Sequence, residues 1–156
     1  METIAKPITG KECLMTNDAT RYALTGFYVA FNTRDLAAMS RNWAQTDDIV
    51  MDNPLGGIRR GWPAIREVYE RLFTGAAQVY VEFYDHSLHK AGDIFYAVGR
   101  ERGYFQRGEN RIDLAIRTSR IFRRFNGRWL QVHHHGSIED PALLDRYQKA
   151  VRAEPA

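Results

Sequence analysis

An Asn-Gly pair near the C-terminus constrains the fold of this chain more than any other feature. Asn126 and Gly127 separate two segments, 111–125 and 128–138, in which apolar and polar residues alternate. A two-residue type I′ turn requires positive φ at both central positions, and Asn followed by Gly adopts this geometry readily. The pair therefore predicts a tight antiparallel hairpin and fixes how the residues of its two strands pair.

Alternation in two earlier segments extends this hairpin into a larger antiparallel sheet. Strands are expected from residue 79 onward and over 94–105, because apolar residues recur there at every second position. Turn residues separate the strands at 91–93 and 107–110. The second half of the chain is therefore a sheet of four long strands, and one short strand over 48–53 precedes it.

Helical periodicity marks four segments, at 17–32, 36–44, 62–74 and 140–152. The third has Pro63 in its first turn, where proline costs little. The other three begin at side chains that can accept a hydrogen bond from the first turn, namely Asn17 or Asp18, Asp35, and Asp140. Three helices therefore surround the short strand, and one follows the sheet.

The order of these elements predicts an α+β fold in one domain. The 156 residues, 44% hydrophobic and 26% charged, suit a globular domain over 1–156. We expect a core at about 17–138, an N-terminal tail at 1–16 and a C-terminal helix at 140–152. The sheet should be cone-shaped and strongly curved, capped by the N-terminal helices, and should enclose a pocket.

Cysteine content and apolar runs indicate where the protein resides. Cys13 is the single cysteine, so no internal disulfide can form. No apolar run could span a membrane, and residues 1–10 lack the core of a signal peptide. We expect a cytoplasmic protein without a membrane partner. The net charge of +3 comes mostly from arginines that alternate with apolar residues, so no nucleic-acid partner is expected.

Counting outward from the Asn-Gly turn predicts which side chains share a face of the sheet. Arg120 falls opposite His133, and Thr118 falls opposite His135. We assign this face to the concave side beneath the helices. A β-bulge in the hairpin would shift the register by one residue and exchange the two faces.

The opposite, convex face of the hairpin carries apolar residues. Ile121, Leu130 and Val132 fall on this side of the predicted sheet. An apolar face that no helix covers is typical of a subunit interface. We therefore expect a homodimer formed through this face.

The inward-facing arginine and histidines are the candidate functional groups. A buried guanidinium needs an anionic partner, so Arg120 either binds an anionic ligand or forms a salt bridge, for example to Glu101 or Asp52. His133 and His135 either form hydrogen bonds in a polar pocket or act on a ligand, with His133 as the proton-transfer group. Two histidines on one strand could also bind a metal, but no third ligand is evident, and we expect neither metal nor cofactor.

Three segments have the pattern of a known family: Tyr-Val-Ala-Phe-Asn-Thr-Arg-Asp-Leu at 28–36, Ile-Val-Met-Asp-Asn-Pro-Leu-Gly at 49–56 and Gly-Trp-Pro-Ala-Ile-Arg-Glu-Val-Tyr at 61–69. They resemble the nuclear-transport-factor-2-like superfamily and, within it, the SnoaL-like branch of ketosteroid isomerases and polyketide cyclases. Residues 120–137 are similar to the association domain of calcium/calmodulin-dependent kinase type II. The resemblance implies a cystatin-like roll. By similarity to the kinase domain, Arg100 and Arg120 would be pocket arginines.

Two departures from the resemblance bear on activity. Asn53 stands where ketosteroid isomerases carry their aspartate base, and Phe27 stands where their catalytic tyrosine lies. A carboxamide cannot accept and return a proton at neutral pH, so the resemblance does not imply steroid isomerisation.

The pocket residues together predict a general function. Trp43, Trp62 and Tyr69 would form its apolar wall, beside the polar residues Asn53, Arg100, Arg120, His133 and His135. Such a pocket suits a small anionic or carbonyl-bearing molecule. The protein would be a binder or an enzyme of lyase, isomerase or hydrolase type; the alternative is a non-catalytic homodimerisation domain.

Overall fold

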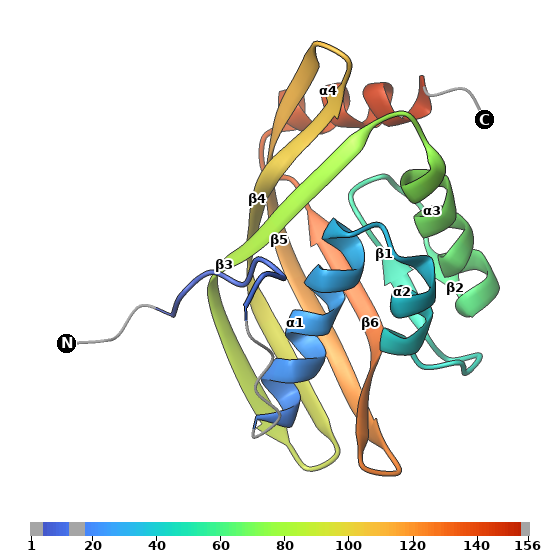
Figure 1. The fold of residues 1–156 in the computed structure, drawn as a ribbon, viewed down its shortest axis with the longest axis vertical. Coiled ribbons are helices and arrows are strands. Elements are labelled where there is room, and N and C mark those ends of the chain that lie inside the picture. Colours follow the sequence, from blue (N-terminus) through green and yellow to red (C-terminus); the bar gives the residue numbers. More distant parts are fainter. Residues whose placement is uncertain (1–4, 13–17, 154–156) are drawn as a thin grey trace.

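The computed structural model describes residues 5–12 and 18–153, in which helices cover one face of a strongly curved sheet (Figure 1). The sheet has six strands in the order β2-β1-β6-β5-β4-β3. The prediction of an α+β fold with a curved, helix-covered sheet is confirmed. Among the described residues, no helix is long and apolar enough to cross a membrane. In chain order the elements are α1 (Ala19–Asn32), α2 (Leu36–Asn42), β1 (Val50–Asp52), β2 (Arg59–Arg60), α3 (Trp62–Thr74), β3 (Gln78–Ala91), β4 (Ile94–Arg107), β5 (Asn110–Phe125), β6 (Arg128–Ser137) and α4 (Pro141–Arg152).

The helices begin where the sequence predicts. The side chains of Asp18, Asp35 and Asp140 each accept a hydrogen bond from a backbone N–H in the first turn of α1, α2 and α4. The alternative cap Asn17 lies outside the described residues. The sequence predicts that the second helix reaches residue 44, but it ends at 42, because Trp43 adopts an extended conformation and bridges to β6.

The short strands around residue 50 build one edge of the sheet. β1 pairs in parallel with β6 and antiparallel with β2, so it joins the N-terminal helical segment to the end of the long hairpin. Sequence analysis missed β2, because a strand of two residues, both arginine, is too short to show alternation.

A close contact between β3 and β4 accompanies the curvature of the long strands. At Gly103 in β4, an added Cβ would lie 1.8 Å from the carbonyl oxygen of Tyr80 in β3. No side chain fits in that space, so only glycine permits the two backbones to approach this closely.

The β5–β6 hairpin turns at Asn126 and Gly127, as predicted, with φ of 48° and 81°. The predicted pairing holds as far as Phe122 opposite Gln131. The register then shifts by one residue, so that Ile121 pairs with His133, and Val132 is the extra residue of a β-bulge.

The bulge corrects the predicted faces of the histidines. Arg120 is opposite His134, not His133, and His134 lies buried on the inner face. His133 and His135 lie on the outer face instead, because successive side chains of a strand point to opposite sides. The shift occurs where the neighbour of β6 changes from Trp43 to β1, which sequence alternation does not reveal.

Candidate functional site

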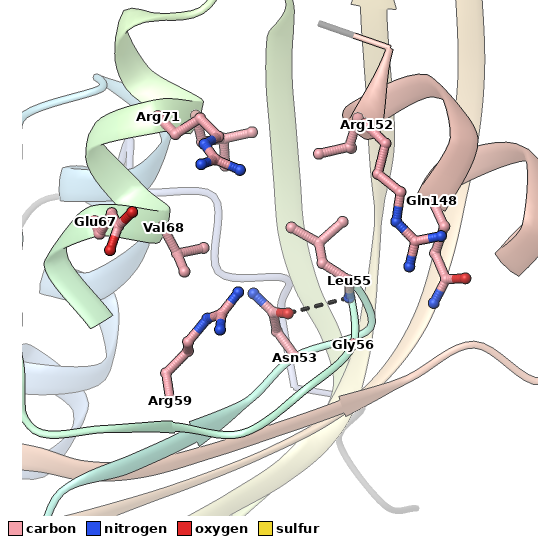
Figure 2. Close-up of a pocket in the computed structure, with 11 residues that line it drawn as sticks. Asn53, Leu55, Gly56, Arg59, Glu67, Val68, Arg71, Gln148 and Arg152 are labelled. Carbon is pink, nitrogen blue, oxygen red and sulfur yellow. Dashed lines mark hydrogen bonds between the residues drawn. The ribbon is translucent and has the colours of Figure 1, made fainter. Parts of the chain in front are cut away.

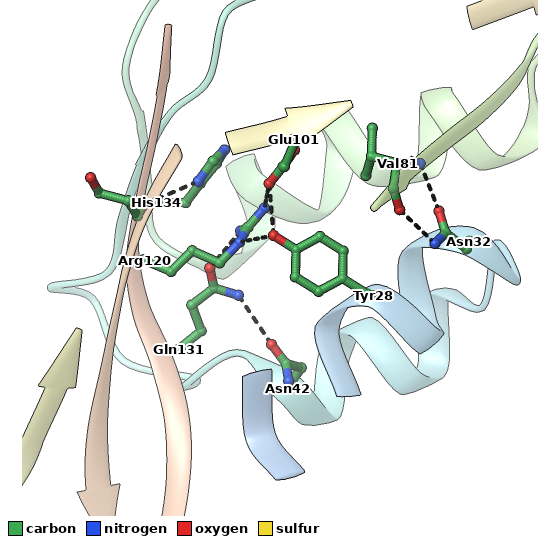
Figure 3. A network of polar contacts seen from close by, with 9 residues as sticks. Tyr28, Asn32, Asn42, Val81, Glu101, Arg120, Gln131 and His134 are labelled. Atoms are coloured by element: carbon green, nitrogen blue, oxygen red, sulfur yellow. Dashed lines mark hydrogen bonds and ion pairs between the residues drawn. The ribbon is translucent and has the colours of Figure 1, made fainter. Parts of the chain in front are cut away.

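A buried network of polar side chains occupies the centre of the molecule (Figure 3). The Arg120 side chain from β5 is 2% exposed and donates from Nη2 to Oε1 of Glu101 in β4, at 3.0 Å. Its Nη1 donates to Oε1 of Gln131 in β6, at 2.8 Å. The hydroxyl of Tyr28 in α1 donates to the same Glu101 oxygen at 2.9 Å. Four elements therefore meet at one ion pair.

Aromatic and amide groups complete the surroundings of Arg120. Its guanidinium carbon lies 3.5 Å from the centroid of the Phe27 ring, which gives a cation–π contact. Gln131 in turn donates to Oδ1 of Asn42 at 3.0 Å. Burial, followed by the charge of Glu101, raises the pKa of Tyr28 well above its usual value, so this phenol stays neutral and donates.

The network decides between the two interpretations of Arg120. The guanidinium donates through Nη2 to the Glu101 carboxylate and through Nη1 to Gln131. Glu101 is one of the two carboxylate partners that the sequence suggests for Arg120. Arg120 is therefore part of an internal salt bridge and does not present a free guanidinium to a ligand.

His134 lies beside this network in β6. Its Nδ1 lies 3.3 Å from the carbonyl oxygen of Ser119. Because a carbonyl oxygen only accepts, Nδ1 carries the hydrogen and Nε2 keeps a free lone pair. Burial, together with the positive charge of Arg120, holds the pKa of His134 well below its usual value. The imidazole is neutral at physiological pH and can accept a proton or a hydrogen bond at Nε2.

A small inner cavity adjoins these groups. It has a volume of about 50 Å³, which is room for one or two water-sized molecules. Its walls include the ion pair and His134, and also two phenols, Tyr69 from α3 and Tyr147 from α4. Burial raises the pKa of Tyr69 to about 12, so its hydroxyl keeps its proton and can donate. The inner cavity therefore places a few polar groups in a mostly apolar lining, and it is too small for a ligand beyond a few atoms.

A larger outer cavity opens next to it, between the segment that follows β1 and the helices α3 and α4 (Figure 2). Its volume is about 210 Å³. The two cavities share Asn53, Leu55, Val68 and Leu72, so these side chains form the neck between them. A ligand in the outer cavity would have the inner polar groups directly beyond this neck.

Three arginines give the outer cavity a positive charge. Arg59 comes from β2, Arg71 from α3 and Arg152 from the end of α4. None of them forms an ion pair with another described residue, whereas Arg66 on the same helix as Arg71 is paired with Glu70 at 2.8 Å. Glu67 is the one carboxylate in the lining. Their guanidinium groups are therefore available to an anion.

The structure places five of the predicted site residues in or near this region, and Arg120 of the buried network is one of them. Asn53 lines both cavities, and Tyr69 lines the inner one. Trp43 is 1% exposed and belongs to the hydrophobic core, and Trp62 is half-buried and packs against that core. The two tryptophans line neither cavity, so they support the site through packing only.

Arg100 is not a pocket residue, and this prediction was wrong. Its side chain lies on the outer surface and pairs with Asp85 at 3.3 Å and Glu139 at 3.0 Å. The next residue, Glu101, points inward. When a position is assigned by similarity with an error of one residue, the assigned side chain falls on the opposite face of the strand.

His133 and His135 are also not pocket residues. They flank Asp52 on the outer face, where Nδ1 of His135 lies 2.6 Å from the Asp52 carboxylate. Nδ1 of His133 lies 2.9 Å from the carbonyl oxygen of Val50. In the described part of the chain, no group of three or more potential ligands is placed to hold a metal ion.

Sequence analysis missed His134 and the three arginines of the outer cavity. Regular alternation assigns His134 to the outer face, because it does not reveal the bulge. The arginines come from segments far apart in the sequence, 59, 71 and 152, and no local pattern brings them together. Arg71 alone carried a signal, because it follows Val68 of the apolar stripe of α3 by three residues and so shares a side of that helix with it.

The comparisons with known proteins agree with this architecture. The model of the SnoaL-like domain matches residues 21–141. The chain belongs to the SnoaL-like domain family. No curated protein matches it.

Solved structures similar to this SnoaL-like protein share its fold. One, from Thiobacillus denitrificans and provisionally described as a calcium/calmodulin-dependent protein kinase type II association domain, is 24% identical; the match covers 77% of this chain and 94% of that one, with a TM-score of 0.67. Another, from Streptomyces avermitilis and provisionally described as an NTF2-like dehydratase, is 20% identical, with coverage of 76% and 92% and a TM-score of 0.67. A ketosteroid isomerase-like protein from Erwinia carotovora is 18% identical, with coverage of 79% and 95% and a TM-score of 0.65. At these identities the likeness concerns the fold alone.

Loss of Arg120 should destabilise the protein strongly. Arg120→Met leaves the Glu101 carboxylate buried without a counter-charge, and we expect a loss of about 3–5 kcal/mol in the free energy of unfolding. Arg120→Met combined with Glu101→Leu should recover part of this loss, since no buried charge remains. Urea unfolding measures each value. As a control, Arg124→Met breaks an exposed pair with Asp93 on the same strand and should cost less than about 1 kcal/mol. If the loss in the double variant equals the sum of the losses of Arg120→Met and Glu101→Leu measured singly, the two residues are not energetically coupled.

Burial of neutral His134 should make stability depend on pH. Because its pKa is lowered in the folded state, the unfolded chain binds a proton first as the pH falls. His134 should therefore contribute no pH dependence above about pH 7 and a loss of up to about 1.4 kcal/mol per pH unit as the pH falls below its unfolded pKa of about 6.5. His134→Gln should flatten this slope between pH 6.5 and 5.5 when compared with its own stability at pH 7.5. Equal slopes for both proteins would show that His134 is protonated in the fold.

Proposed function

We propose that this SnoaL-like protein binds a small organic anion in the outer cavity. The observation that carries the proposal is the set of three arginines without ion-pair partners among the described residues, Arg59, Arg71 and Arg152, around one cavity of about 210 Å³. Guanidinium groups bind carboxylates through paired, charge-assisted hydrogen bonds. The apolar neck residues Leu55 and Val68 would contact the carbon skeleton of the ligand.

The inner cavity gives this proposal a chemical component. A carbonyl or hydroxyl group of the bound molecule that enters the neck would meet His134 Nε2 as a proton acceptor and the Tyr69 hydroxyl as a donor. An enzyme of lyase, isomerase or hydrolase type would use these two groups, so His134 takes the proton-transfer role that the sequence pattern assigns to His133. Asn53 caps the loop by accepting from the Leu55 N–H at 3.1 Å, and its carboxamide supplies no base, so ketosteroid isomerisation is not the proposed reaction.

Ligand binding should be visible as a thermal shift. A short carboxylate at ten times its dissociation constant stabilises the folded state by about 1.4 kcal/mol, which corresponds to about 3–6 °C in Tm. Arg71→Gln should reduce this shift by at least half, because it removes one anion-binding group. Arg66→Gln, on the exposed side of the same helix, is the matched control and should keep the shift. If no carboxylate raises the Tm of the wild type, or if both variants respond equally, the outer cavity is not the binding site.

We also propose, as the second function, a homodimer formed through the convex face of the sheet. Ile94, Tyr96 and Val98 of β4 are 42–44% exposed and alternate along the strand on the side away from the helices. Tyr96 pairs with Ile121 in β5, which extends this apolar surface toward the half-buried Leu130 and Val132 of β6. Large apolar side chains gathered on an uncovered sheet face favour a subunit interface.

A charged residue on this face should yield monomers. Tyr96→Glu introduces an unpaired carboxylate into the proposed interface, and its exposed position should leave the fold intact. Ile58→Glu is the matched control, because Ile58 is 57% exposed and lies between β1 and β2, outside the strands β4 to β6 that carry the proposed interface. Sedimentation equilibrium should give the dimer mass for the wild type and Ile58→Glu, and the monomer mass for Tyr96→Glu. A dimer that survives Tyr96→Glu would place the interface elsewhere.

A further inference from the structure

The charges of the outer cavity point to a more specific class of ligand. We infer that the ligand carries two separated anionic groups, as in a small dicarboxylate. This inference rests on the proposed function, since it concerns the same cavity. It goes beyond that function because a monocarboxylate would satisfy the proposal of anion binding equally well.

The lining of the outer cavity carries more positive than negative charge. Three arginines against the single Glu67 leave two formal positive charges around the cavity. One carboxylate would neutralise only one of them. Like charges that face one cavity repel each other unless a counter-ion of matching charge is present, so a dianion complements the site better than a monoanion.

The side chain of Arg71 faces the cavity and has no ion-pair partner on its own helix. Glu67 and Arg71 are four residues apart on α3, in the order that favours an ion pair. The same spacing does produce ion pairs at Arg66–Glu70 and Asp145–Lys149, each at 2.8 Å. Glu67 and Arg71 form no such pair, and both line the cavity. Arg71 is therefore one of the two positive charges that a ligand has to balance.

Two of the three arginines lie on different walls of the cavity, each on the same segment as an amide side chain (Figure 2). Asn53 and Arg59 belong to the segment that runs from β1 into β2, and each offers N–H donors. Gln148 and Arg152 belong to α4, where a spacing of four residues puts them on one face of the helix. Each wall thus pairs an arginine with an amide. Apolar side chains, including Leu55 and Val151, lie in the same lining and suit a carbon chain between two anionic ends.

Contacts within the protein fix the position of α4 relative to the segment that follows β1. Gln148 Nε2 donates to the carbonyl oxygen of Pro54 at 3.0 Å, which ties α4 to the segment after β1. The preceding residue of α4, Tyr147, packs edge-on against Phe105 of β4 at 5.9 Å between ring centroids. These contacts hold the helix that carries Arg152 in place without a ligand. In this proposal, a compact anion such as phosphate would contact one of these arginine–amide pairs, whereas a dicarboxylate would contact both.

Matched pairs of acids test the inference at constant ionic strength. Succinate is compared with butyrate, and glutarate with valerate, because each pair has the same carbon count and differs in one carboxylate. Inorganic phosphate is the compact control. Dissociation constants come from isothermal titration calorimetry on the full chain. We expect at least one dicarboxylate to bind about tenfold more tightly than its partner and than phosphate, since it gains a second charge-assisted contact.

Two variants test whether a residue of α4 makes the second contact with the dicarboxylate. Arg152→Gln should lower dicarboxylate affinity to the level of the matched monocarboxylate and leave the monocarboxylate affinity within about twofold. Arg146→Gln, also on α4 but outside the cavity lining, should change neither. Equal affinities for both acids of each pair, or a preference for phosphate, would overturn the inference of two separated anionic groups while anion binding stands. If no acid and no phosphate binds, the proposed function itself fails.

Discussion

The salt bridge between Arg120 and Glu101 is the interaction on which the interior of this protein depends. It lies on the inner face of the sheet beneath α1 and is nearly inaccessible to water. Two buried charges are tolerated only where they are paired and their remaining hydrogen-bonding groups are satisfied. Tyr28, Gln131 and the Phe27 ring meet this requirement, and each comes from a different position along α1 or β6. The ion pair therefore specifies how the helix sits on the sheet as well as filling the core.

The same salt bridge divides the interior into parts with different roles. Because Arg120 already has protein partners, an anion that competed for it would leave Glu101 unpaired in the core. The groups that remain available in the inner cavity are neutral, namely His134 and the buried phenols. Of the two cavities, only the outer one is lined by arginines without an ion-pair partner in the described part of the chain, and these are exposed to solvent. Anion recognition and the buried ion pair are thus separated by the neck at Leu55 and Val68.

The sequence predicts the elements of this fold better than it predicts the faces of its side chains. The Asn126-Gly127 turn, the aspartate caps and the change from helical to strand periodicity are local signals, and the structure confirms each of them. The bulge at Val132 and the inward position of Glu101 are displacements of one residue, which leave the composition of a strand unchanged but reverse its faces. The outer cavity could not be predicted for another reason, since its three arginines line one cavity only after α4 has packed against the end of the sheet.

Stability and ligand binding can vary separately in this fold, because the buried network and the outer cavity have different roles. Substitutions at Arg120 or Glu101 act on stability, because they leave a charge without its partner. Substitutions at the three arginines of the outer cavity remove exposed side chains, which contribute little to folding. Substitution of these three arginines can therefore change which ligand the outer cavity binds, while the buried network stays intact. Asn53 lies at the boundary, since it contacts both cavities and fixes the loop that carries Leu55. An acid at that position would place a negative charge between the three arginines and His134, and so would oppose the binding of the anion that the arginines attract.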